Sequence, residues 1–75
     1  MVGRPDGDTL VVTVRGSAGP AVRAAFEDLE VVVAEETTEL RSPGNDQAAL
    51  HGILRRVQDL GLEIVEVRQV HGAGL

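Results

Sequence analysis

The chain has 75 residues, of which 43% are hydrophobic and 25% are charged, a composition typical of one folded globular domain. It contains no cysteine, which excludes disulfides, thiol catalysis and thiolate metal centres, and its net charge of -5 argues against nonspecific nucleic-acid binding. The opening residues carry no leader pattern, and no segment approaches the roughly 20 apolar residues of a membrane span. We therefore expect a single cytoplasmic domain over residues 1–75, with residues 1–8 and 71–75 frayed.

The first half of the chain predicts a strand, a short helix and a second strand. Residues 9–15, TLVVTVR, alternate in polarity and are rich in β-branched side chains, which indicates a strand. Three consecutive valines make residues 30–34 a second strand. Between them, Pro20 suits the first turn of a helix, and apolar residues follow it at helical spacing: Val22, Ala25, Phe26 and Leu29.

Residues 35–41 allow two interpretations. They could continue the second strand as one bent strand, or turn at Glu35 and Glu36 and return as an antiparallel third strand. The turn contains neither Gly nor Asn, the residues that tight hairpin turns prefer. We favour the hairpin and keep the bent strand as the alternative.

The second half carries the strongest periodic signal. Residues 42–46 interrupt the preceding strand, and either Asn45 or Asp46 can cap the helix that follows. Gly61 is placed to end that helix, and residues 62–70, LEIVEVRQV, predict a last strand. One continuous apolar stripe defines the helix: Leu50, Ile53, Leu54, Val57 and Leu60.

This order of elements predicts an α+β, ferredoxin-like βαββαβ fold, in which two helices cover one face of a four-stranded antiparallel sheet with strand order 4-1-3-2. Valines of the other parity would then leave a partly apolar open face that includes Val11, one parity of residues 31–33, and Ile64 or Val65. Phe26 is the only aromatic residue, so the core is thin. We therefore expect a homo-oligomer joined through the face of the sheet.

The segment within residues 46–70 combines DQAALHG, a helix, DLGL and a closing strand, and the opening strand contains TVRG. In these motifs the chain resembles a family of short uncharacterised proteins common in actinobacteria. The resemblance is strongest in the second half. It supports the second helix and the last strand, and it implies no activity.

His51 is the sharpest candidate for a site, because an imidazole can act as a general base or bind a ligand near neutral pH. Gln47 lies one helical turn before it and could share a ligand. On a helical wheel His51 falls off the apolar stripe, and no Ser or second His has the spacing of a triad or a zinc site. We therefore favour a polar residue at the edge of the helix.

Two other clusters are weaker candidates. Gly16, Ser17 and Gly19 could offer backbone N–H groups to an anion, but they lack the dinucleotide and P-loop patterns, and a turn explains them. Carboxylates at positions 35, 36 and 39 could attract a hard cation, but the ordered loop of an EF-hand is missing. We expect a solvated hairpin tip there, and no bound metal or cofactor.

Three function hypotheses remain, of which we favour a non-enzymatic, homo-oligomeric interaction or regulatory module. The second is a small-ligand sensor, because the topology resembles that of the ACT domain, which binds amino acids between subunits; Gly16 to Gly19 would be the matching loop. The third is a small or accessory metabolic enzyme that uses His51. A nucleic-acid or membrane partner is not expected.

Overall fold

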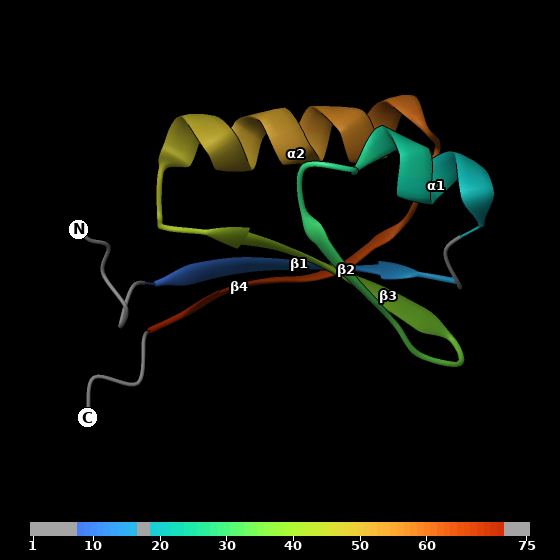
Figure 1. Cartoon of the computed structure of the whole chain (residues 1–75), viewed down its shortest axis with the longest axis horizontal. Helices are drawn as coiled ribbons and strands as arrows, with labels where there is room; N and C mark the ends of the chain where they lie inside the picture. Colours follow the sequence, from blue (N-terminus) through green and yellow to red (C-terminus); the bar gives the residue numbers. More distant parts are fainter. Residues whose placement is uncertain (1–7, 17–18, 72–75) are drawn as a thin grey trace.

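The structure is a computed structural model, which describes residues 8–16 and 19–71 (Figure 1). The sheet order is β2-β3-β1-β4, which is the expected 4-1-3-2 order read from the other edge, and all neighbours are antiparallel. Both helices lie on the same face of the sheet, so the ferredoxin-like prediction is confirmed. The elements are β1 (Thr9–Arg15), α1 (Pro20–Ala25), β2 (Glu30–Val33), β3 (Thr37–Pro43), α2 (Gln47–Asp59) and β4 (Ile64–Val70).

The hairpin between β2 and β3 is also confirmed. Val33 lies opposite Thr38, and the Ala34 N–H donates to the Thr37 carbonyl at 2.8 Å, which leaves Glu35 and Glu36 as the loop. β3 is longer than predicted, because it continues through Pro43. The first two residues of the predicted breaker cluster therefore belong to the sheet, and Pro43 is the last residue of β3, opposite Thr9.

α1 begins at Pro20 as predicted but is shorter than its apolar stripe suggested. It has six residues, and the Phe26 N–H closes it by donating to the Val22 carbonyl at 3.1 Å. The Leu29 N–H then donates to the Phe26 carbonyl at 3.0 Å, in a turn outside the helix. The stripe thus continues into the loop, and its apolar side chains pack on the core from there.

α2 has the predicted start and end. The Asp46 carboxylate accepts a hydrogen bond from the Ala48 N–H at 3.0 Å, which caps the first turn. Gly61 follows the helix with a φ of 72°, a left-handed conformation that favours glycine. Leu60 is exposed, contrary to its place in the predicted stripe, because the helix ends one residue before it. Among the described residues, no helix is long and apolar enough to cross a membrane.

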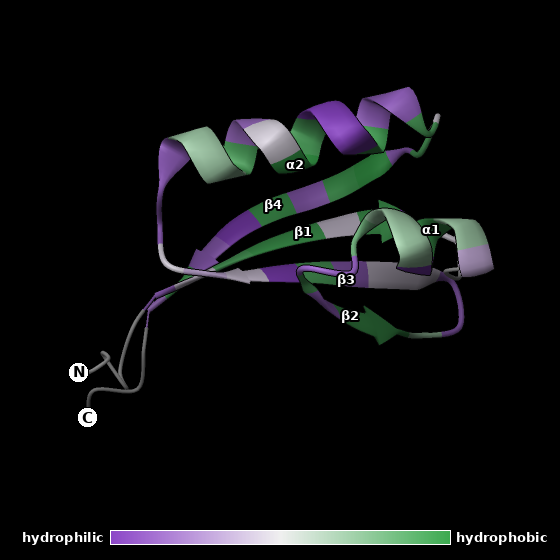
Figure 2. Cartoon of the chain, turned by 45° about the horizontal axis from the view of Figure 1, so that its top comes forward, coloured by the Kyte–Doolittle hydropathy of each residue, from purple (hydrophilic) through white to green (hydrophobic). Residues whose placement is uncertain are grey.

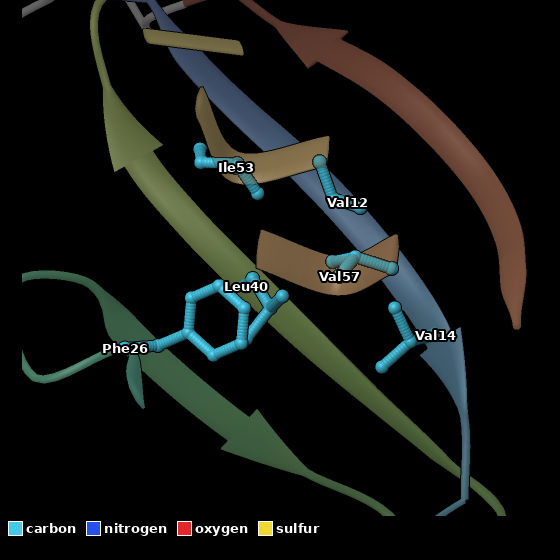
Figure 3. Close-up of a cluster of buried hydrophobic side chains, with 6 residues drawn as sticks. All are labelled: Val12, Val14, Phe26, Leu40, Ile53 and Val57. Atoms are coloured by element: carbon cyan, nitrogen blue, oxygen red, sulfur yellow. The ribbon is translucent and has the colours of Figure 1, made fainter. Parts of the chain in front are cut away.

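The core lies between the helices and the sheet face that they cover, which we call the helix face. Figure 3 shows its six buried side chains, which come from β1, β3 and α2 and from the loop after α1. Half-buried residues, including Leu54 and Leu62, pack around them. The six are Val12, Val14, Phe26, Leu40, Ile53 and Val57.

Arg56 joins α2 to the segment that follows α1. Its guanidinium donates to both carboxylate oxygens of Asp28, at 2.8 and 3.0 Å, and to the Ala25 carbonyl at 3.0 Å. It also lies 5.3 Å from the centre of the Phe26 ring. The hydrogen bond from Arg56 lowers the pKa of Asp28. The basic pair Arg55 and Arg56 therefore includes one residue that holds the two helices together.

Candidate functional site

The structure separates the residues that the sequence singled out. His51 and Gln47 lie exposed on the first half of α2, as the helical wheel predicted for His51. Gly16 lies after β1, at the opposite end of the sheet from the start of α2 (Figure 1). Within residues 8–16 and 19–71, no hydrogen bond or ion pair involves the side chain of His51. The candidate residues do not form one site.

The glycine loop uses its backbone groups internally. The Gly16 N–H donates to the Glu36 carbonyl at 2.6 Å, and the Gly16 carbonyl accepts from the Thr38 hydroxyl at 2.7 Å. The Gly19 carbonyl accepts from the Arg23 N–H at 3.1 Å. Gly16 has a φ of 97°, so a turn that requires glycine accounts for it. Ser17, the remaining candidate here, lies outside the described residues.

The acidic residues of the hairpin divide into two groups. Glu35 and Glu36 lie exposed in the loop, as predicted. Glu39 lies farther along β3, where the Arg41 guanidinium donates to it at 2.8 and 3.2 Å. In the described part of the chain, no group of three or more His, Asp or Glu side chains is placed to hold a metal ion.

The open face, opposite the helices, carries charged side chains as well as two exposed valines, Val32 and Val70. The register places Val11 of β1 between Arg41 of β3 and Arg68 of β4. Val11 is only 2% exposed, so the expectation that it lies on an exposed apolar face is wrong. Long arginine side chains rise on both sides of it, and their aliphatic stems can cover apolar surface while the charges stay in water.

A short network of ion pairs connects these arginines. Glu39 accepts from Arg41, and this hydrogen bond raises the pKa of Arg41. The Arg68 guanidinium lies 3.8 Å from a carboxylate oxygen of Glu39 and 3.8 Å from one of Glu66. Those two distances exceed hydrogen-bond length, so Arg68 is held less tightly than Arg41.

A pocket of about 260 Å³ lies on the open face above Val11. Two guanidinium groups beside an apolar floor and the Thr9 hydroxyl suit a small carboxylate. Such a ligand would compete with Glu39 for Arg41. The lining residues are Thr9, Val11, Arg41, Arg68 and Val70.

The clearest surface feature is the free edge of the sheet at β4. In Figure 2, β4 and β2 form the two edges, and β4 carries both apolar and polar stretches along its length. Val67 shares the helix face with its neighbour Val12, yet Val67 is 44% exposed while Val12 is fully buried. The helices therefore cover β1 and leave β4 open. Its exposed apolar residues are Ile64, Val65, Val67 and Val70.

The start of β1 and the end of β4 meet at Asp8. Its carboxylate accepts hydrogen bonds from Asn45 and Gln69, both at 3.1 Å, and lies 3.2 Å from Nδ1 of His71. Asp8 and His71 fall in the segments that were expected to fray, and these contacts tie them together; the rest of those segments lies outside the described residues. The cluster joins the start of β1, the loop before α2 and the end of β4.

A family model matches residues 5–68 of the chain, most of its length. The chain belongs to that family, Domain of unknown function (DUF8691). The predicted resemblance to a family of uncharacterised proteins is confirmed to this extent, and its actinobacterial distribution stays a prediction. Neither the curated proteins nor the solved structures gave a match.

Sequence reasoning on this DUF8691 chain missed Arg41, Arg68 and Glu39 as a group. Nothing in their local spacing joins them, because they come together only when β3 and β4 pair with β1. A signal was present for the β4 edge: the last strand contains an acid and a base on either side of a valine, EVR at residues 66–68.

Proposed function

We propose that this DUF8691 domain is a non-enzymatic, homo-oligomeric interaction module that associates through the β4 edge of its sheet. The observation that carries the proposal is the exposure of β4 over all seven of its residues. An edge strand presents unpaired backbone N–H and C=O groups, and proteins that remain monomeric blunt or cover such edges. The exposed valines of β4 give this edge apolar surface to bury.

The proposal shifts the expected contact from the face of the sheet to its edge. The open face is lined by Arg41, Arg68 and Glu39, whose charges would lose hydration if a second sheet packed on them. Strand addition avoids that cost, because edge pairing leaves both faces of the sheet in place.

The enzyme hypothesis has less support from the described residues. His51 is exposed on the solvent side of α2, and no described carboxylate or hydroxyl is bonded to it. A general base needs a neighbouring group that orients it or a substrate pocket beside it. The pocket above Val11 is lined from the opposite face of the sheet to α2.

The mass of the full chain in solution tests the proposal. Light scattering coupled to gel filtration over a micromolar dilution series should show a dimer that dissociates on dilution. Val67→Glu should shift the chain to monomer, because it places a charge in the proposed contact. Val33→Glu is the matched control, since Val33 lies on the helix face of the other edge strand and is 38% exposed. A wild-type chain that is monomeric throughout the series would refute the proposal.

A second candidate, binding of a small carboxylate ligand, is favoured by the pocket above Val11. It keeps the sensor hypothesis but moves the site away from the glycine loop. A thermal-shift screen with amino acids and dicarboxylates should raise Tm for a ligand that fits. Arg41→Gln should remove the shift while leaving the mass unchanged, because β3 lies two strands from the β4 edge.

A further inference from the structure

We infer that two copies of this chain pair β4 with β4 in antiparallel register, with Val67 on the two-fold axis. The inference rests on the proposed function and adds to it the partner and the register. One side of β4 is bonded to β1, and no strand in residues 8–16 and 19–71 pairs with its other side. Val67 is the middle residue of the seven in β4, and its neighbours Glu66 and Arg68 keep a regular register with β1.

Antiparallel self-pairing allows few registers. Residues that lie opposite one another point to the same face, so the two-fold axis must pass through a residue position. An axis at Glu66 places that carboxylate opposite its own copy, and an axis at Arg68 does the same with two guanidinium groups. Like charges directly opposite destabilise a sheet.

An axis at Val67 instead makes the charges complementary. Glu66 lies opposite Arg68 of the second copy, and Arg68 lies opposite Glu66, so the symmetry forms the pair twice. Both side chains are available, being 57% and 46% exposed. The ion-pair contacts that Arg68 makes within the chain are both 3.8 Å long, which leaves its donors free to form shorter bonds across the edge.

On the helix face of the sheet, the centre of this contact is apolar. Val67 meets its own copy there. Val67 is 44% exposed in the single chain, so the contact removes apolar surface from water. The sheet becomes continuous across the dimer, with eight strands in place of two groups of four.

The second edge of the sheet fits a copy less well. β2 has four residues against seven in β4, and short edge strands are one way in which proteins discourage pairing. A two-fold axis at Val32, inside β2, would place Glu30 opposite Ala34 and form no pair of opposite charges. Length and charge together favour β4.

Single cysteines test the register cleanly, because the chain contains none of its own. Opposed residues in antiparallel strands have Cα atoms about 4.5 to 5.5 Å apart, within the span of a disulfide. Val67→Cys should therefore form a linked dimer when copper-phenanthroline in air oxidises the two thiols. Val65→Cys should link at least about tenfold more slowly, because its copy lies four residues away along the edge, about 14 Å. Val33→Cys, on the β2 edge, is the second control.

Exchanging the charges at positions 66 and 68 tests the register independently, with the dimer affinity measured by light scattering. Glu66→Arg and Arg68→Glu each turn two attractive pairs into two repulsive ones, and each should weaken the dimer by roughly tenfold or more. The double variant, with both changes, should restore the wild-type affinity. Far-UV circular dichroism confirms that each variant is folded.

The outcomes separate the two proposals. A wild-type dimer in which Val65→Cys or Val33→Cys links as fast as Val67→Cys would overturn the register and leave the interaction module standing. Single charge variants that dimerise as well as wild type would do the same. A wild-type chain that stays monomeric over the dilution series would overturn both.

Discussion

Replacing Val11 with alanine tests whether the open face has a buried layer of its own. Val11 is 2% exposed, so the two carbon atoms that alanine lacks are removed from a buried site. Each buried carbon contributes about 0.8 kcal/mol, so the variant should lose about 1.6 kcal/mol of unfolding free energy, and a residual cavity would add to this. For a domain of this size the loss lowers Tm by roughly 6 to 13 °C.

Val32→Ala is the matched control. Val32 lies on the open face of β2 and is 36% exposed, so its substitution removes less buried surface and should cost less than about 1 kcal/mol. Both substitutions lose similar strand propensity, so the difference between them reports burial. Thermal and urea denaturation, followed by circular dichroism at one protein concentration, measures both variants.

The comparison has a result that would refute the reasoning. If Val11→Ala costs no more than Val32→Ala, the arginine side chains do not shield Val11, and the open face is solvated down to β1. The apolar open face expected from the sequence would then be restored. A cost at Val11 that exceeds the cost at Val32 supports a covered central strand.

Two further predictions concern the glycines and the ion pair between the helices. Both Gly52 and Gly61 have open space where a Cβ would stand, but Gly61 has a φ of +72° and Gly52, within α2, does not. Gly52→Ala should therefore stabilise the protein by up to about 1 kcal/mol and Gly61→Ala should destabilise it by about 1 kcal/mol; Tm shifts of the same sign would contradict this. Because Arg56 lowers the pKa of Asp28, the pair stabilises the fold above the unfolded carboxyl pKa of about 3.9 and loses this effect as the pH falls further. The Tm difference between wild type and Asp28→Asn should then shrink in acid, and a difference that does not depend on pH would show that the charge is irrelevant.

Local signals predicted most of the fold. The cap at Asp46, the stop at Gly61 and the periodicity of α2 depend on neighbouring residues, and the structure has them where the sequence placed them. The exposure of His51 followed from the same helical wheel. The short length of α1 could not be predicted from neighbouring residues, because Phe26 leaves the helix and packs beneath Arg56 of α2.

The candidate site could not be predicted from the sequence for a related reason. The alternation of β1 placed Val11 on the open face, which is right, but its burial depends on which side chains the neighbouring strands bring beside it. That depends on register, a property of pairs of strands. The exposure of Val67 likewise depends on where the helices lie across the sheet, since its neighbour Val12 on the same face is buried.

The arrangement of the sheet explains why its edge is the proposed contact. The central strand β1 is shielded on both faces: the helices cover Val12, and Arg41 and Arg68 flank Val11. The helices cover β1 but not β4, so the apolar residues of β4 remain exposed although they belong to the same sheet. With one aromatic residue and no cysteine, the chain has few other means of adding stability. Pairing of β4 buries apolar side chains and satisfies backbone groups at the same place, so one contact would serve both the fold and the association.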